Sequence, residues 1–199
     1  MPLPPRTIAL TPRPSLGIEN GMSNPPHGTL IIGAGHAGGT VAALLRQYEY
    51  TAPITIVGEE PLAPYQRPPL SKAWLKGEAD ADSLALRPDS FYAENRIDLI
   101  LNVKATAIDR AAKTVALSDG RTLSYDHLII ATGARARTLP IPGADLRGVL
   151  TLRSAADAEN LKGLLGPGKR LAVIGGGYIG LEAAASALAL GGSAVVLER

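Results

Sequence analysis

Five short apolar runs predict buried β-strands in this chain. They cover residues 29–32, 54–57, 128–131, 171–174 and 194–197. Continuous apolar runs, rather than alternating ones, are typical of parallel strands that are covered on both faces. Residues 37–48 instead carry apolar side chains at helical spacing, with small alanines facing the sheet. Strands that alternate with helices in this way predict an α/β fold.

The hydrophobic period changes between residues 106 and 125. Apolar residues there alternate with polar ones around the turn sequence Ser118-Asp119-Gly120-Arg121. Alternation on both sides of such a turn predicts a hairpin, so we expect a small antiparallel meander inserted into the first α/β unit.

Two serines are expected to cap helices. Ser71 follows a proline-rich stretch, residues 61–69, in which proline favours extended structure, and a helix is expected to start there. Ser154 is followed three residues later by Asp157, which is the spacing of a reciprocal capping pair.

A glycine motif follows two of the strands and opens a helix each time. The copies are Gly33-Ala34-Gly35-His36-Ala37-Gly38 and Gly175-Gly176-Gly177-Tyr178-Ile179-Gly180. The first glycine permits a tight turn, the second lets a pyrophosphate approach the backbone, and the third lets helix and strand pack closely. An acid, Glu59 or Glu198, follows about twenty residues after each motif, where a carboxylate can bind a ribose diol. The sequence therefore predicts two dinucleotide sites.

Composition narrows the chemistry. The chain has 199 residues, 46% hydrophobic, a net charge of +2 and no cysteine. Disulfides, thiolate metal sites and thiol redox chemistry are excluded, and no metal site is expected. No apolar run is long enough to span a membrane, and 4% aromatic content offers no nucleic-acid stacking platform. We expect a cytoplasmic protein whose redox chemistry, if any, is carried by a bound cofactor.

These motifs together resemble the N-terminal half of a pyridine-nucleotide-dependent flavoprotein of the ferredoxin reductase type, the group that reduces putidaredoxin, rubredoxin and the biphenyl dioxygenase ferredoxin. Besides both glycine motifs, the resemblance rests on Arg67-Pro68-Pro69-Leu70-Ser71-Lys72 and Ala131-Thr132-Gly133-Ala134-Arg135. It implies a Rossmann-like FAD-binding domain with an inserted antiparallel meander, then the start of a Rossmann-like NAD(P)-binding domain. The expected boundaries are a disordered proline-rich extension at 1–27, the FAD domain at 28–150 and the NAD(P) domain at 151–199.

The resemblance also implies a role for individual residues. Those expected to contact FAD are Gly33, Gly35, His36, Ala37, Gly38, Glu59, Arg67, Lys72, Ala105, Thr132, Gly133 and Arg135. Those expected to contact NAD are Gly175, Gly177, Tyr178, Ile179, Gly180 and Glu198. The carboxylate of Glu198 favours NADH over NADPH because it repels a 2′-phosphate, although Arg199 beside it could tolerate that phosphate.

Lys72 and Glu182 are the expected catalytic residues. We expect them to meet beside the flavin, where the carboxylate offsets the cost of burying the ammonium. The alternative is that both are solvated surface charges.

The implied reaction passes electrons from NADH through FAD to a small iron–sulfur protein. Members of this group are about twice as long, so the chain is expected to be an N-terminal fragment that needs the missing half in cis or in trans. An inactive nucleotide-binding remnant, a nitrite reductase subunit and an NADH oxidase remain as alternatives.

Overall fold

The computed structural model describes residues 27–198, so the extension predicted for residues 1–27 lies, except for residue 27, outside the described part. A four-stranded parallel sheet forms its first half, in the order β3-β2-β1-β7. Its strands are β1 (Thr29–Ile32), β2 (Ile54–Val57), β3 (Ile97–Ile100) and β7 (His127–Ile130). The predicted return of the strand at 128–131 to the first sheet is confirmed, because β7 pairs with β1.

Alternate residues of β1 enter two different cores. Ile31 packs with Ile54 and Ile56 beneath α1 (His36–Gln47) and α4 (Asp89–Glu94). Leu30 and Ile32 point to the other face, where the meander covers them. Burial on both faces explains why three consecutive residues of the strand, 30 to 32, are apolar.

The meander consists of β4 (Ala105–Asp109), β5 (Thr114–Leu117) and β6 (Thr122–Ser124), paired antiparallel in that order. The predicted hairpin is confirmed, since the turn sequence Ser118 to Arg121 joins β5 to β6.

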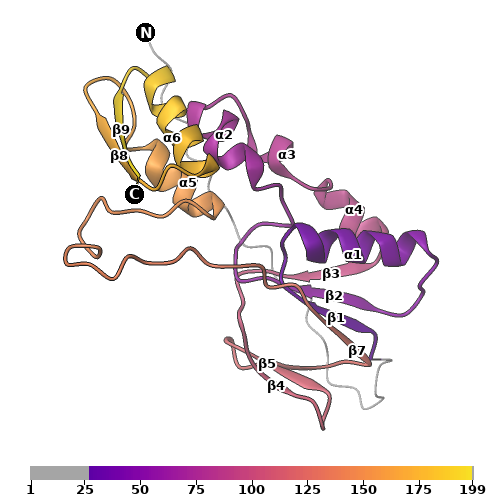
Figure 1. The fold of residues 1–199 in the computed structure, drawn as a ribbon. Helices are drawn as coiled ribbons and strands as arrows, with labels where there is room; N and C mark the ends of the chain where they lie inside the picture. The colour runs from indigo at the N-terminus through magenta and orange to yellow at the C-terminus, as the bar shows by residue number, and fades with distance from the viewer. Residues whose placement is uncertain (1–26, 199) are drawn as a thin grey trace.

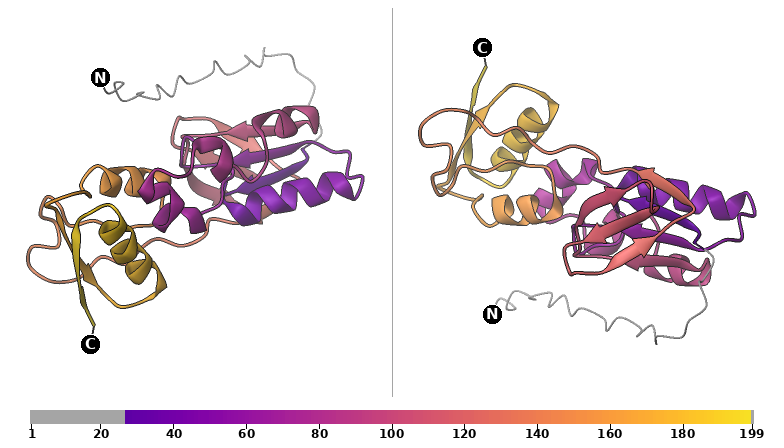
Figure 2. Two further views of the ribbon diagram at one scale, coloured as in Figure 1. Left: turned by 90° about the horizontal axis from the view of Figure 1, so that it is seen from above. Right: turned by 90° about the horizontal axis from the view of Figure 1, so that it is seen from below.

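A second, smaller unit carries β8 (Arg170–Ile174), α6 (Tyr178–Ala189) and β9 (Ser193–Leu197), with β8 and β9 parallel. It is preceded by α5 (Ala155–Lys162), where Ser154 and Asp157 form the predicted capping box. Figures 1 and 2 show this unit and the four-stranded sheet at opposite ends of an elongated molecule.

The excursion between β2 and β3 lies between the two ends. It contains the 3-10 helix η1 (Pro68–Ser71) and two one-turn helices, α2 (Ala73–Lys76) and α3 (Ala81–Leu84). Its apolar side chains pack against α5 and α6 in one core, which is made of Tyr65, Leu70, Trp74, Leu75, Leu84, Ala155, Ala158, Leu161 and Ala183. The excursion therefore joins the first sheet to the second unit.

The prediction that Ser71 caps a helix is wrong. Lys72 is the N-cap of α2, and no side chain caps that helix. The Ser71 hydroxyl instead donates to a carboxylate on α6, because the buried interface offers it a charged acceptor.

No helix among residues 27–198 is long and apolar enough to cross a membrane.

Candidate functional site

The first glycine turn has the geometry that its sequence predicts. Gly33 has φ +119°, and a Cβ there would lie 2.2 Å from the carbonyl oxygen of Ala131. A Cβ on Gly38 would lie 2.0 Å from the Gly33 oxygen, so helix and strand are in contact at this point. A Cβ on Gly35 would meet nothing within 4 Å. The turn is closed at its first and third glycines and open at its second.

The second turn shares the positive φ, the open second glycine and the close third glycine of the first, but a Cβ on its first glycine, Gly175, would meet none of the described residues within 4 Å. Gly175 has φ +100°, and a Cβ on Gly180 would lie 2.5 Å from the Gly175 oxygen. The space above Gly177 is again open within 4 Å. Two independent segments therefore build similar cradles.

In the described part of the chain, the first helical turn at each cradle presents free backbone donors. Gly35 caps α1 and Gly177 caps α6 without any side-chain hydrogen bond, and neither first turn contains an acidic residue. The residues of these first turns are exposed, namely His36 and Ala37 on α1 and Tyr178 and Ile179 on α6. Unpaired N–H groups at a helix N-terminus bind anions, so each cradle fits the pyrophosphate of a dinucleotide.

The two predicted ribose acids have different surroundings. Glu59 accepts from Arg135, whose Nη2 lies 3.0 Å from its Oε2, and Lys104 Nζ lies 3.9 Å from its Oε1. Two predicted FAD contacts, Glu59 and Arg135, are thus already side by side. Glu198 accepts from the backbone N–H of Gly176, which places this carboxylate at the second glycine turn.

A hollow of about 280 Å³ lies beside the first cradle. It is lined by Ile32, Ala105, Thr106, Ala107, Ile108, Ile130 and Thr132. The predicted FAD contacts Ala105 and Thr132 therefore face the same space, and Gly133, with φ +69°, follows directly. This space is mostly apolar, as suits part of a flat organic ligand.

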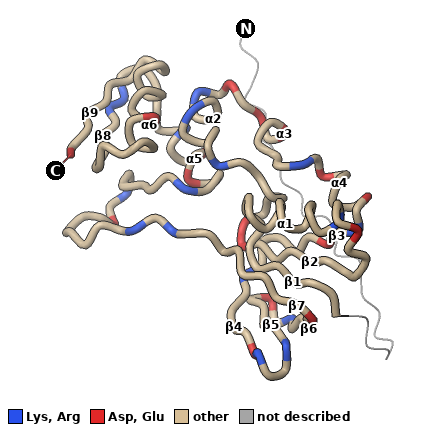
Figure 3. Tube along the Cα trace, turned by 45° about the vertical axis from the view of Figure 1, so that its right-hand side comes forward, with Lys and Arg blue, Asp and Glu red and all other residues tan. Residues whose placement is uncertain are grey.

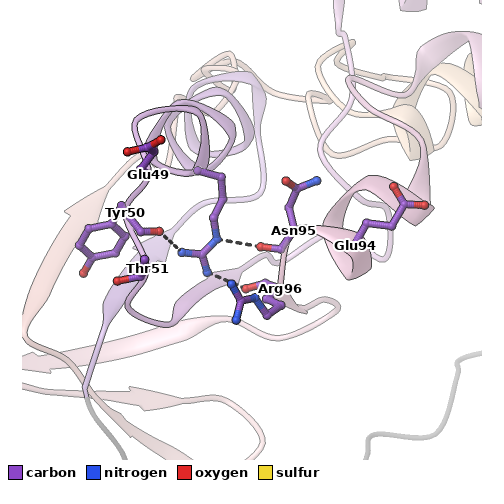
Figure 4. A pocket seen from close by; sticks show the side chains of 7 residues that line it. Glu49, Tyr50, Thr51, Glu94, Asn95 and Arg96 are labelled. Carbon is purple, nitrogen blue, oxygen red and sulfur yellow. Dashed lines mark hydrogen bonds between the residues drawn. The ribbon is translucent and has the colours of Figure 1, made fainter.

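A second hollow, of about 230 Å³, is lined by Arg46, Glu49, Tyr50, Thr51, Glu94, Asn95 and Arg96 (Figure 4). Arg46 donates there to the carbonyls of Tyr50, Ala52, Asn95 and Arg96. This hollow lies at the C-terminal end of α1, away from the glycine turn. None of the residues that line it is a predicted site residue. The arrangement fixes loops rather than forming a ligand site.

The predicted meeting of Lys72 and Glu182 is present. Lys72 Nζ lies 2.8 Å from Glu182 Oε1, although the two residues are far apart in the sequence. The second carboxylate oxygen accepts from Ser71 Oγ at 2.5 Å. The hydrogen bond from Lys72, and after it that from Ser71, holds the pKa of Glu182 below its usual value. Glu182 is therefore ionised at neutral pH.

Arg67 takes part in a network that the sequence did not reveal. It donates to Tyr65 Oη, to the backbone oxygen of Arg153 and to Glu60 Oε1. Tyr65 Oη in turn donates to Glu60 and accepts from the backbone N–H of Ala155. Arg67 thus holds the excursion against the start of α5. In the sequence, the one signal of this network is the aromatic residue Tyr65 inside a proline-rich stretch.

The orientation of the sheet relates the two cradles. The segment that follows β7 runs from the carboxyl edge of the sheet towards the β8–β9 unit (Figure 1). Since β1 is parallel to β7, the first glycine turn lies at that same edge. The first cradle therefore opens on the side of the second unit, where Lys72 and Glu182 meet.

Known proteins resemble this chain in sequence and in fold. A family model described as pyridine nucleotide-disulphide oxidoreductase matches residues 27–199. The probable ferredoxin reductase CtmF of Castellaniella defragrans is 54% identical over 85% of this chain and 42% of its own length. The rubredoxin-NAD(+) reductase of Pseudomonas putida is 46% identical over 85% of this chain and 44% of its own length.

Solved structures agree with these relatives. The reductase in a covalent complex of putidaredoxin reductase with putidaredoxin matches with a TM-score of 0.78 and 40% identity, over 87% of this chain and 42% of the other. The chain therefore spans about two fifths of the length of the relatives it matches. These matches confirm the resemblance that the sequence motifs indicated, including its restriction to the N-terminal part.

Proposed function

The chain belongs to the pyridine nucleotide-disulphide oxidoreductase family, and on that premise we propose that it is the nucleotide-binding part of an NADH-dependent FAD flavoprotein. Its electron acceptor would be a small iron–sulfur protein of the ferredoxin type. The observation that carries the proposal is the pair of open glycine cradles, joined by an ion pair from the first unit to the helix of the second. The absence of cysteine favours the ferredoxin reductase branch over branches that use a redox disulfide.

We assign two domains to the chain. Residues 28–150 would bind FAD, and residues 151–199 would bind the nicotinamide nucleotide. FAD, when bound, would supply hydride acceptance and the release of single electrons. The chain would contribute binding and orientation. The N–H groups of α1 and α6 would hold the two pyrophosphates, and Glu59 and Glu198 would accept hydrogen bonds from the ribose hydroxyls. A carboxylate at Glu198 supports NADH as the donor.

Lys72 and Glu182 are the proposed catalytic residues. The ammonium of Lys72 is half exposed and would bring a positive charge to the flavin edge, where reduction adds negative charge. Glu182 would keep that ammonium in place and limit the cost of removing it from water.

The acceptor would approach a positively charged surface. The segment from 131 to 153 carries four arginines and one aspartate, and it runs along the side between the two units (Figure 3). Arginines in such a row steer an acidic partner electrostatically. A cytoplasmic location accompanies this proposal.

Binding and reduction of FAD test the proposal directly. We expect the chain, joined in cis or in trans to the C-terminal half that it is expected to need, to bind FAD and to be reduced by NADH in rapid mixing, with Lys72→Ala slowing reduction by about tenfold or more while FAD stays bound. Lys76→Ala is the matched control, because Lys76 lies one turn further on and pairs only with Glu78 in the described structure. Failure to bind FAD would leave the inactive remnant as the better description. Reduced flavin that passes electrons to oxygen or nitrite but not to a ferredoxin would favour the other flavoenzymes.

A further inference from the structure

Two buried serines lie at the contact between the Lys72 segment and α6. Ser71 and Ser186 are each 4% exposed. Ser71 Oγ donates to Glu182 Oε2 at 2.5 Å, and Ser186 Oγ donates to the backbone oxygen of Ser71 at 2.9 Å. Glu182 and Ser186 are four residues apart on α6 and therefore lie on the same face of the helix. One face of α6 thus contacts both the backbone and the side chain of Ser71.

The two oxygens of Glu182 are bonded to different partners. Lys72 occupies Oε1 and Ser71 occupies Oε2, and Lys72 also donates to the backbone oxygen of Pro68 at 3.2 Å. Among residues 27–198, Lys72 is the one charged side chain within ion-pair distance of Glu182. Without a donor on Oε2, the carboxylate could rotate about its side chain and leave the ammonium.

We propose that Ser71 is a positioning residue for this pair. Its hydroxyl fixes the rotation of the Glu182 carboxylate, so that the Lys72 ammonium is held at one place between the two units. The geometry alone supports the positioning of the ammonium, whereas its importance for catalysis rests on the proposed function. Because α6 begins at the second glycine cradle, the same helix that would bind the nicotinamide nucleotide also sets the position of the ammonium.

A carboxylate titration tests the positioning without any cofactor. The side-chain carboxyl signals of ¹³C-labelled glutamate would be followed against pH in the 199-residue chain, with Glu182→Gln identifying the Glu182 signal. We expect Ser71→Ala to raise the pKa of Glu182, because a hydrogen bond to the ionised form is lost. Ser186→Ala removes an equally buried hydroxyl that does not touch Glu182, and we expect no comparable rise.

The second measurement is the pH profile of flavin reduction by NADH. We expect Ser71→Ala to move the acidic limb of that profile upward and to lower the rate by roughly threefold to tenfold, since a loosely held charge stabilises less. Ser71→Cys, which has nearly the same shape but a weaker donor, should shift the titration in the same direction, and it serves if Ser71→Ala does not fold.

The two measurements separate the two proposals. An unchanged Glu182 pKa in both Ser71 variants, or an equal rise in Ser186→Ala, would overturn the positioning role. A raised pKa in a chain whose flavin NADH cannot reduce would support the positioning and refute the proposed function.

Discussion

Adding one methyl group to a glycine of a cradle should impair folding at one position and cofactor binding at another. Gly35→Ala and Gly38→Ala add the same Cβ three residues apart in one turn. At Gly38 that atom would lie 2.0 Å from the backbone oxygen of Gly33 and 3.3 Å from Ile31 Cγ2, whereas at Gly35 nothing lies within 4 Å. The same substitution is therefore expected to act on the fold at one position and on the ligand at the other.

The magnitude follows from the overlap. Carbon and carbonyl oxygen normally stay about 3.3 Å or more apart, so α1 and β1 must separate by more than 1 Å in Gly38→Ala. Because both atoms belong to the backbone, we expect the upper end of the overpacking range, about 3 kcal/mol. Gly35→Ala exchanges one helix cap for a poorer one, at about 0.5–1 kcal/mol. For a chain of this size, each kcal/mol lowers the melting temperature by about 2–4 °C.

Thermal unfolding without cofactor, followed by FAD titration, would check the reasoning. We expect Gly38→Ala to melt about 6–12 °C below the wild type, and Gly35→Ala to melt within about 4 °C of it. Gly35→Ala should nevertheless lose at least about tenfold in FAD affinity, because its methyl group occupies the space over the free N–H donors. Gly177→Ala and Gly180→Ala form the matching pair in the second cradle. Equal melting temperatures for Gly35→Ala and Gly38→Ala, or full FAD affinity in Gly35→Ala, would refute the assignment.

Three further substitutions test buried contacts elsewhere in the fold. Tyr65→Phe removes the hydroxyl that accepts from the buried N–H of Ala155, so we expect a loss of about 1–3 kcal/mol in urea unfolding, against almost none for the exposed Tyr48→Phe. Arg46→Lys keeps the charge but lacks the guanidinium group that donates to four carbonyls, so we expect the free energy of unfolding to fall by about 2 kcal/mol. An unchanged free energy of unfolding would show that these hydrogen bonds are dispensable. Tyr92 is buried with no hydrogen-bond partner for its hydroxyl among the described residues, so Tyr92→Phe should raise stability by about 1 kcal/mol. Burial raises the pKa of Tyr92 to about 12, whereas the pKa of a tyrosine in the unfolded chain is about 10. The wild type should therefore lose stability as the pH rises from about 10 towards 12, and Tyr92→Phe should lose less over the same range.

Short-range patterns in the sequence were sufficient to predict much of the site. The glycine turns are local, since each consists of a strand end and the first turn of the next helix, and the spacing of their residues determines their shape. The capping box at Ser154 and the hairpin between β5 and β6 are equally local, and the structure confirms both. The meeting of Lys72 with Glu182 was predicted on the physical argument that a buried ammonium needs a partner carboxylate, not from any pattern within either segment.

The sequence by itself determined two Rossmann-like units, their glycine cradles and the meander, because apolar period, glycine and turn residues act over a few neighbours. Only the tertiary structure decided that the excursion packs on α5 and α6, that Ser71 bonds to Glu182, and that Tyr65 joins Arg67 to α5. These contacts link residues 90 to 111 positions apart. No local preference encodes such pairs, since the partner of a buried donor depends on which surfaces the whole chain brings together.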